Sequence, residues 1–268
     1  MTSFQTMVKY IAIVFAVCLA VGIIGGILGA LGIACGFFGD DGVLDGMKTY
    51  EISENITDIR IEINAADLTV STADGFSLES NLKYLSVKEN DGCLVITEKK
   101  RFGINYDAPE LKLCIPEGLV FGEATIITGA GRVSIDTLCA DKLKMELGAG
   151  EVRIDSLGAN SKAKIDGGAG RLTIGGGSMC DLDLDMGVGE LNCKSKLCGS
   201  CELDYGVGSA NLVLIGTKED YRVELNKGIG DAELDGQSVG DGIVYGDGSS
   251  KVEIDGGIGK IKVSFEEN

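Results

Sequence analysis

Apolar and polar residues alternate with a period of two over most of the chain beyond residue 50, which is the period of a strand with one buried face. Residues 142–147 alternate in this way, and so do residues 151–154. Leu147 and Val152 both belong to the apolar set although an odd number of steps separates them, so the chain must bend between them. The Gly-Ala-Gly tripeptide at 148–150 therefore predicts a corner that joins two strands.

This strand–corner–strand pattern repeats seven times as Gly, a small aliphatic residue, Gly, a polar residue, an aliphatic residue, a polar residue and an aliphatic residue. The first glycines are Gly129, Gly148, Gly168, Gly187, Gly206, Gly228 and Gly257, at intervals of 19, 20, 19, 19, 22 and 29 residues. No window of the repeats has the spacing of an amphipathic helix. Residues 128–268 are therefore predicted to form an all-β parallel β-solenoid, or β-helix, with coils of about 19 residues.

Residues 51–127 show the same alternation with less regularity. Residues 64–70, Asn-Ala-Ala-Asp-Leu-Thr-Val, match the repeat with its glycines replaced. Because terminal units of a solenoid are usually atypical, we interpret 51–127 as an irregular β capping segment of the same domain. A separate small β-domain is the alternative. Residues 39–50 are predicted to be a linker, and residues 240–250 a surface loop with a hairpin tip.

The N-terminal part differs, because residues 10–38 form a run of 29 residues without a charge. A bilayer core needs about 20 apolar residues in a helix, so this run predicts a transmembrane helix that precedes the solenoid. The apolar region of a signal peptide is shorter than this run. A lipoprotein acceptor at Cys35 is a further alternative, although the usual Leu three positions before it is missing.

Charges on either side of the predicted span set its orientation. Lys9 and the α-amino group precede it, whereas Asp40, Asp41 and Asp45 follow it before the first base. The positive-inside rule then places residues 1–9 in the cytoplasm and residues 41–268 outside a single-pass cell-membrane anchor.

Composition narrows the function classes. The chain has no His, which excludes Ser-His-Asp and Cys-His catalysis and His-ligated zinc. Of its 41 Gly, 27 lie beyond residue 127, so the glycine excess belongs to the repeat.

The net charge of the chain is −17. This charge disfavours nucleic acid and anionic membranes as partners, whereas basic partners or divalent cations remain possible.

Stacked coils turn equivalent residues into columns about 4.8 Å apart. One column alternates in sign and is expected to hold the coils in register: Arg132, Glu151, Arg171 and Glu190. A second column is acidic: Glu146, Asp166, Asp185, Asp204, Asn226 and Asp255. These carboxylates are expected to accept hydrogen bonds from N–H groups of the corners. The alternative is an acidic ridge that binds Ca²⁺ or a basic partner.

Nine cysteines leave three interpretations open. Most are expected to be small core residues. Cys198 and Cys201, with Cys193 just upstream, also have the spacing of a redox pair or of part of a thiolate metal site. No second CxxC motif and no His completes such a site, and disulfides remain the third interpretation.

The N-terminal span, the irregular β segment and the stacked Gly-x-Gly-x-aliphatic-x-aliphatic coils together resemble the bacterial "putative adhesin" family over about residues 50–265. That family is a domain of unknown function on cell-envelope proteins. The resemblance implies a right-handed β-helix at the cell surface and a part in the envelope stress response. It offers no catalytic residues to carry over.

We therefore expect a membrane-anchored cell-surface module that acts as an adhesin-like binding domain or an envelope scaffold, without catalysis, cofactor or metal. Its expected partners are the lipid bilayer, through residues 10–38, and an envelope protein or glycan; self-association stays open. One alternative is a polysaccharide-active β-helix enzyme that uses Asp181, Asp183 and Asp185. The other is a bactofilin-like, self-assembling cytoskeletal solenoid.

Overall fold

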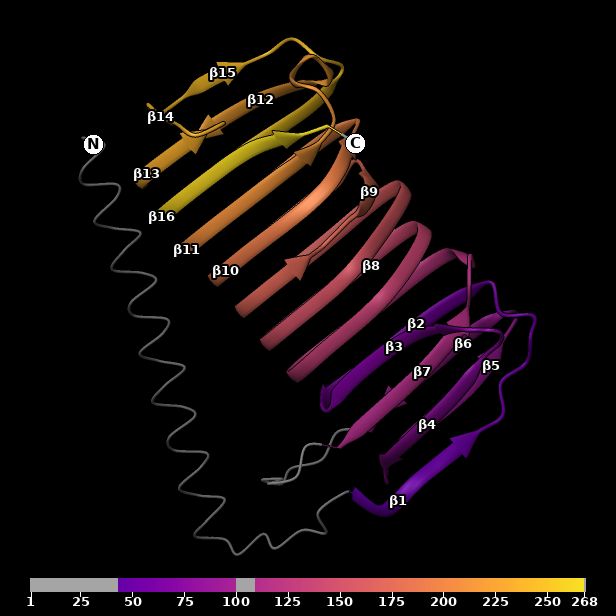
Figure 1. The fold of residues 1–268 in the computed structure, drawn as a ribbon. Coiled ribbons are helices and arrows are strands. Elements are labelled where there is room, and N and C mark those ends of the chain that lie inside the picture. Colours follow the sequence, from indigo (N-terminus) through magenta and orange to yellow (C-terminus); the bar gives the residue numbers. More distant parts are fainter. Residues whose placement is uncertain (1–42, 100–108, 268) are drawn as a thin grey trace, which may run out of the picture. The chain divides into compact units, whose positions relative to one another are not determined.

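The computed structural model describes residues 43–99 and 109–267, and their backbone is almost entirely β-strand (Figure 1). The strands are β1 (Val43–Tyr50), β2 (Asp58–Ala65), β3 (Asp67–Ala73), β4 (Ser77–Leu82), β5 (Leu85–Asn90), β6 (Cys93–Glu98), β7 (Glu110–Pro116), β8 (Val120–Ile174), β9 (Gly177–Cys180), β10 (Leu182–Cys198), β11 (Ser200–Ile215), β12 (Tyr221–Asn226), β13 (Ile229–Leu234), β14 (Gln237–Val239), β15 (Ile243–Tyr245) and β16 (Ser250–Glu266). A single 3₁₀ turn, Lys218–Asp220, interrupts them within these residues.

Successive coils stack in parallel and in register, which confirms the predicted solenoid. β10 pairs with β8 on one side and with β11 on the other, so Gly170, Gly189 and Gly208 lie in one column. The short strand β9 pairs with β8 and with the end of β10, which shows that each coil also has a return segment. A coil thus consists of two long strands that meet at a glycine corner, followed by a short return.

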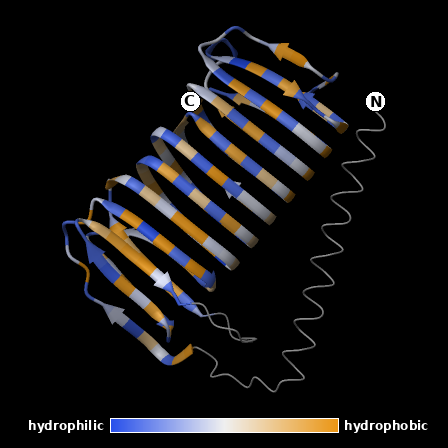
Figure 2. Ribbon diagram, turned by 180° about the vertical axis from the view of Figure 1, so that it is seen from behind, coloured by the Kyte–Doolittle hydropathy of each residue, from blue (hydrophilic) through white to orange (hydrophobic). Residues whose placement is uncertain are grey.

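The core follows from the alternation of residues along each strand (Figure 2). Leu184, Leu203 and Ile254 are neighbours in the ladder, and each is at most 2% exposed. Their polar neighbours in the sequence face solvent. Each aliphatic side chain removed from water contributes roughly 1.5–3 kcal/mol, so a continuous inner file of such residues can hold the stack together.

Glycine is required at the corners because the coils approach each other there through their backbones. Gly189 has φ +141°, and a Cβ at this position would overlap the carbonyl oxygen of Gly170 in the next coil. The corner between β2 and β3 has Asn64 and Ala66 in place of the two glycines. There the Glu98 carboxylate accepts hydrogen bonds from the backbone N–H groups of Asn64 and Ala65, at 2.6 and 3.2 Å.

The order of the coils departs from chain order near the C-terminus. β16 pairs with β11 on one side and with β12 and β13 on the other, so the last coil lies between two earlier ones (Figure 1). Repeats stacked in chain order would place each coil on its predecessor. All coils carry the same corner and strand spacing, so the motif does not distinguish neighbours, and the 29-residue interval before Gly257 gives the chain length to return.

The N-terminal coils show a matching inversion. β2 and β3 lie between β8 and the later strands β6 and β7. Residues 43–50, expected within a linker, form β1, which pairs antiparallel with β4. Residues 51–99 and 109–127 thus continue the same stack of strands.

Antiparallel strands close both ends of the described stack. β4 and β5 pair antiparallel with β7 and β6, while β14 and β15 pair antiparallel with β13 and β12. The predicted loop at 240–250 therefore contains β15 and borders β14.

The described residues include no helix that is long and apolar enough to cross a membrane. The predicted span at 10–38, with Cys18 and Cys35, and the segment 1–9 that was predicted to be cytoplasmic lie outside the described residues.

Candidate binding surface

Seven carboxylates gather on the outer side of β10, β11, β16 and β12, in two adjacent columns. We call this set the acidic face: Asp183, Asp185, Glu202, Asp204, Glu224, Glu253 and Asp255. One column runs from Asp183 through Glu202 and Glu253 to Glu224. The other runs from Asp185 through Asp204 and Asp255 and ends at Asn226. Like charges in neighbouring strands repel, so this arrangement reduces stability.

Only one edge of the acidic face contacts a base, and the other edge ends at an uncharged amide. Lys164 lies 3.0 Å from Asp183, 3.3 Å from Asp166 and 3.8 Å from Asp185, and its contacts with Asp183 and Asp166 raise the pKa of its ammonium group. At the far end, Asn226 Nδ2 donates to Asp255 Oδ1 at 2.7 Å. Within the described part of the chain, Glu202, Asp204, Glu224 and Glu253 form no salt bridge. Burial raises the pKa of Asp204, and the charges of Asp185, Glu202 and Asp255 add to this.

The predicted hydrogen bonds from corner N–H groups to this column are absent from the described residues. The corners instead belong to the continuous parallel ladders, in which the backbone of one coil pairs with that of the next. Carboxylates do accept backbone N–H groups elsewhere. Asp67 accepts from Arg132 at 2.9 Å, and Asp181 accepts from Ser200 at 2.9 Å.

The middle residue of each corner points outward at the apex, and in four neighbouring coils it is a large aliphatic residue. We call this set the apical ridge: Val188, Val207, Ile258 and Ile229, which are 49, 37, 40 and 44% exposed. Ladder pairing places them in one file in this order. The preceding corners carry Ala130, Ala149 and Ala169. The sequence repeat shows that an aliphatic residue occupies this position, but it does not show that the side chain is exposed. The change from alanine to valine and isoleucine in successive repeats is the signal that could have revealed the exposed ridge.

A shallow hollow of about 530 Å³ lies between the acidic face and the apical ridge. Asp185, Asp204 and Asp255 line it together with the corner glycines, Met186 and Tyr205. The Tyr205 hydroxyl donates to the carbonyl oxygen of Gly189, which fixes the ring inside the corner. The hollow therefore has a rigid backbone floor and a negatively charged side.

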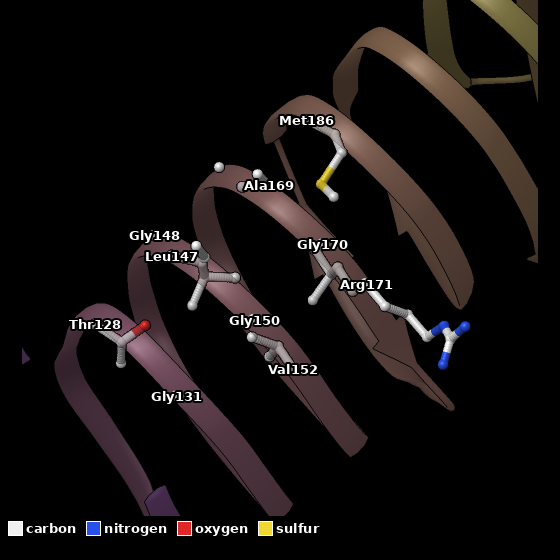
Figure 3. Close-up of a pocket in the computed structure, with 14 residues that line it drawn as sticks. Thr128, Gly131, Leu147, Gly148, Gly150, Val152, Ala169, Gly170, Arg171 and Met186 are labelled. Atoms are coloured by element: carbon white, nitrogen blue, oxygen red, sulfur yellow. The ribbon is translucent and has the colours of Figure 1, made fainter. Parts of the chain in front are cut away.

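A second hollow, inside the corners of β8, is only about 20 Å³ in volume (Figure 3). Leu147, Val152 and Met186 line it, and the Met186 sulfur occupies the space that a side chain at position 167 would fill. The Arg171 side chain extends away from it (Figure 3). This volume is about that of one water molecule, so the hollow has no room for an organic ligand.

The predicted column of alternating charge forms in part on the other side of the corner. Arg171 lies 2.9 Å from Glu190 and 3.7 Å from Glu151, and Arg132 pairs with Asp67 at 3.6 Å. The contacts with Glu190 and Glu151 raise the pKa of Arg171, and the hydrogen bonds from Asn192 and Arg171 lower the pKa of Glu190. The side chains are half exposed, so water and salt screen these pairs and each contributes little to stability.

The cysteines divide between the surface and the core. Cys180 and Cys198 form a disulfide between neighbouring return segments, with Cα atoms 4.5 Å apart. Cys193 and Cys201 are buried and unpaired, and burial raises the pKa of the Cys193 thiol to about 12. The CxxC pair is therefore split between two environments. The described residues contain no cluster of Cys, Asp and Glu arranged to hold a metal ion.

The carboxylates considered for catalysis do not converge. Asp181 occupies a turn with φ +46° and caps Ser200, whereas Asp183 and Asp185 contact Lys164. Asp183 and Asp185 lie on the outer side of β10, and of the three carboxylates only Asp185 lines a hollow, the open one of about 530 Å³.

Several solved structures are similar to this chain at low sequence identity. A "putative cell adhesion protein" from Clostridium sporogenes is 14% identical over 82% of this chain and 99% of its own, with a TM-score of 0.37. A "putative adhesin" from Bacteroides fragilis is 13% identical over 81% of this chain and 96% of its own, with a TM-score of 0.42. A "putative lipid binding protein" from Parabacteroides distasonis is 16% identical over 82% and 98%, with a TM-score of 0.32.

No curated protein matches the chain. The family model described as Toastrack DUF4097 matches residues 48–263, which include the irregular N-terminal coils and all seven glycine corners. The expected resemblance to the adhesin-like envelope family is thereby confirmed, and this chain belongs to the Toastrack DUF4097 family.

Proposed function

We propose that this protein is a membrane-anchored, cell-surface binding module of the adhesin type and that it carries out no catalysis. The observation that supports this most directly is the open acidic face with the adjoining apical ridge. Together they present charged and apolar groups in periodic columns along four coils. A surface of this kind suits the docking of an extended partner better than the enclosure of a small substrate.

The Cys180–Cys198 disulfide supports an extracellular location. Disulfides persist in oxidising compartments and are rare in the cytosol. The proposed orientation, with residues 1–9 in the cytoplasm and residues 41–268 outside, agrees with such a compartment. The antiparallel strands at both ends favour a separate module over a bactofilin-like filament, because such a filament needs open parallel ends for stacking.

Epitope tags at the two chain ends test the location. A tag after Asn268 is expected to bind antibody on intact cells and to be removed by added protease. A tag before Met1 is expected to react only after permeabilisation. The opposite labelling, or protection of both tags, would overturn the surface assignment.

A separate experiment tests binding without catalysis. The full chain is incubated with panels of envelope glycans and envelope proteins, and both retention and cleavage are measured. We expect retention of at least one class without cleavage products. Cleavage of an acidic glycan that is lost in D183N/D185N would favour the enzyme instead.

A further inference from the structure

The apical ridge is an unpartnered apolar file on an otherwise charged surface. Val188, Val207, Ile258 and Ile229 occupy consecutive coils, each between two corner glycines that keep neighbouring side chains away from it. Corners in the preceding coils carry alanine, so the fold itself does not require a large residue at this position. Exposed aliphatic residues in a contiguous file are a feature of interaction sites.

Charge specifies what kind of partner fits beside the ridge. The acidic face runs beside it along the same four coils, and four of its carboxylates form no salt bridge within the described residues. An anionic lipid or a nucleic acid would be repelled. A second copy of the chain would bring a further net charge of −17. A partner with Lys or Arg beside its apolar residues would neutralise the acidic face while it covers the ridge.

The distance between neighbouring coils matches the repeat of an α-helix better than that of an extended strand, which indicates the conformation of that partner. Ridge residues repeat at about 4.8 Å. One turn of an α-helix advances about 5.4 Å, so a helix along the ridge falls out of step by only about 2 Å over three intervals. An extended strand places residues on one side about 6.7 Å apart, and it falls out of step by almost 6 Å, more than one whole coil.

We propose that the apical ridge and the acidic face together dock a cationic amphipathic α-helix. The apolar stripe of the helix lies on the four aliphatic side chains of the ridge. Its Lys and Arg residues reach across the hollow to Asp185, Asp204 and Asp255 and to the outer column of Glu202, Glu253 and Glu224. This inference names a partner class for the proposed binding module and rests on that function.

The test uses the full chain in nanodiscs of zwitterionic lipid and a fluorescent 18-residue Leu/Lys peptide with leucines at helical spacing. Binding is followed by fluorescence anisotropy, with empty nanodiscs subtracted. Two further peptides serve as controls: the same composition in strict alternation, and a Leu/Glu peptide with helical spacing. We expect only the helical Leu/Lys peptide to bind, more weakly as salt rises.

Three variants locate the site. The ridge variant is V188A/V207A/I229A/I258A, which introduces the residue found at the preceding corners and should therefore fold. The face variant is E202Q/D204N/E224Q/E253Q, and the control variant M47A/V120A removes exposed apolar side chains away from both the ridge and the acidic face. Ridge and face variants are each expected to weaken binding at least about tenfold, and the control variant to leave it unchanged. Unchanged circular dichroism verifies the fold of each variant.

Three outcomes would overturn the proposal. The first is equal affinity of the wild type and the ridge variant for the helical peptide. The second is a loss, in the ridge variant, of affinity for zwitterionic vesicles instead of peptide, which would indicate membrane docking. The third is a change from dimer to monomer in the ridge variant, which would indicate a second copy as the occupant. The end-tag experiment decides the surface location independently, so failure of peptide binding alone leaves the proposed location and adhesin-type role standing.

Discussion

The central coils and the terminal coils are built from the same repeat but are assembled differently. From β8 through β11 each coil stacks on the one before it, with corner glycines at intervals of 19 or 20 residues. At the C-terminal end the chain builds an outer coil from β12 and β13 and then returns to insert β16 beneath it. At the N-terminal end β2 and β3 likewise lie inside β6 and β7.

This difference separates two kinds of information in the sequence. The Gly-x-Gly repeat specifies the shape of a coil and its register, because each corner fits against every other corner. It does not specify which coil is the neighbour. That choice follows from the segments between repeats: the 22- and 29-residue intervals hold the 3₁₀ turn and the short strands β14 and β15, which let the chain pass the outer coil and return.

Removal of β16 should have the largest effect and tests the inserted order directly. Truncation after Ser249 deletes the buried side chains of Val252, Ile254, Ile261 and Val263. We expect the free energy of unfolding to fall by more than about 4 kcal/mol and residues 217–249 to become sensitive to protease. Truncation of only 267–268 is the control. Protection of 217–249 in the longer truncation would mean that β12 and β13 stack directly on β11 and that the insertion is dispensable.

A Cβ at a central corner should have the next largest effect. In G189A the new methyl group meets the Gly170 carbonyl oxygen at φ +141°, and we expect a loss of about 3 kcal/mol or more in chemical denaturation. G75A, where nothing lies within 4 Å, is the matched control and should cost little. An equal, small effect at both positions would show that the corners do not approach as closely as described.

The disulfide stabilises the central part of the solenoid, where it links two coils that follow each other in the chain. The terminal parts are stabilised instead by a coil that is inserted between two others. Cys180 and Cys198 are 18 residues apart, and loss of the cross-link in C180S/C198S should cost about 3 kcal/mol. C114S, which changes an unpaired cysteine, is the control. An unchanged melting temperature of the wild type on reduction would contradict the prediction.

The smallest effect concerns the acidic face, which spans the junction between central and terminal coils. The raised pKa of Asp204 means that the folded protein holds this proton more tightly than the unfolded chain, so stability falls as pH rises through that pKa. D204N should therefore raise the free energy of unfolding at pH 7 by about 0.5 kcal/mol. The gain should vanish below the ordinary Asp pKa of about 3.9.

The reverse substitution sharpens this result. Asn226 ends the same column and donates to Asp255, so N226D adds a like charge and removes a hydrogen bond. It should lower stability at pH 7 and have less effect in acid. A gain in N226D would show that the column does not repel.

The periodic features of this protein could be predicted from the sequence because the residues of a single coil determine each of them. Alternation gives the strands and the buried file that includes Leu184 and Leu203, and the odd step from Leu147 to Val152 reveals the corner. The disulfide remained one of three interpretations, because its partners meet only when the return segments stack. The position of β16 depends on long-range pairing, which no local pattern encodes.

Only one part of the candidate surface could be predicted from the sequence. The acidic column with Asp185, Asp204 and Asp255 follows from equal spacing. Its second column and the exposed apex emerge only when the strands are placed side by side. The expected hydrogen bonds from the corners were wrong because the corner backbone pairs with the next coil instead.

The two inversions also determine how the solenoid resists a pull on its ends. Most solenoids can be peeled one repeat at a time, because the terminal repeat has a single neighbour. Here β16 has a coil on each side, and so does the β2–β3 coil. Tension applied at the C-terminal end must break two ladders at once, and tension at the N-terminal end meets the same double ladder after β1 detaches. If such a protein is anchored at one end and pulled by a bound partner, its resistance to unfolding would thus depend on the order in which its coils are stacked.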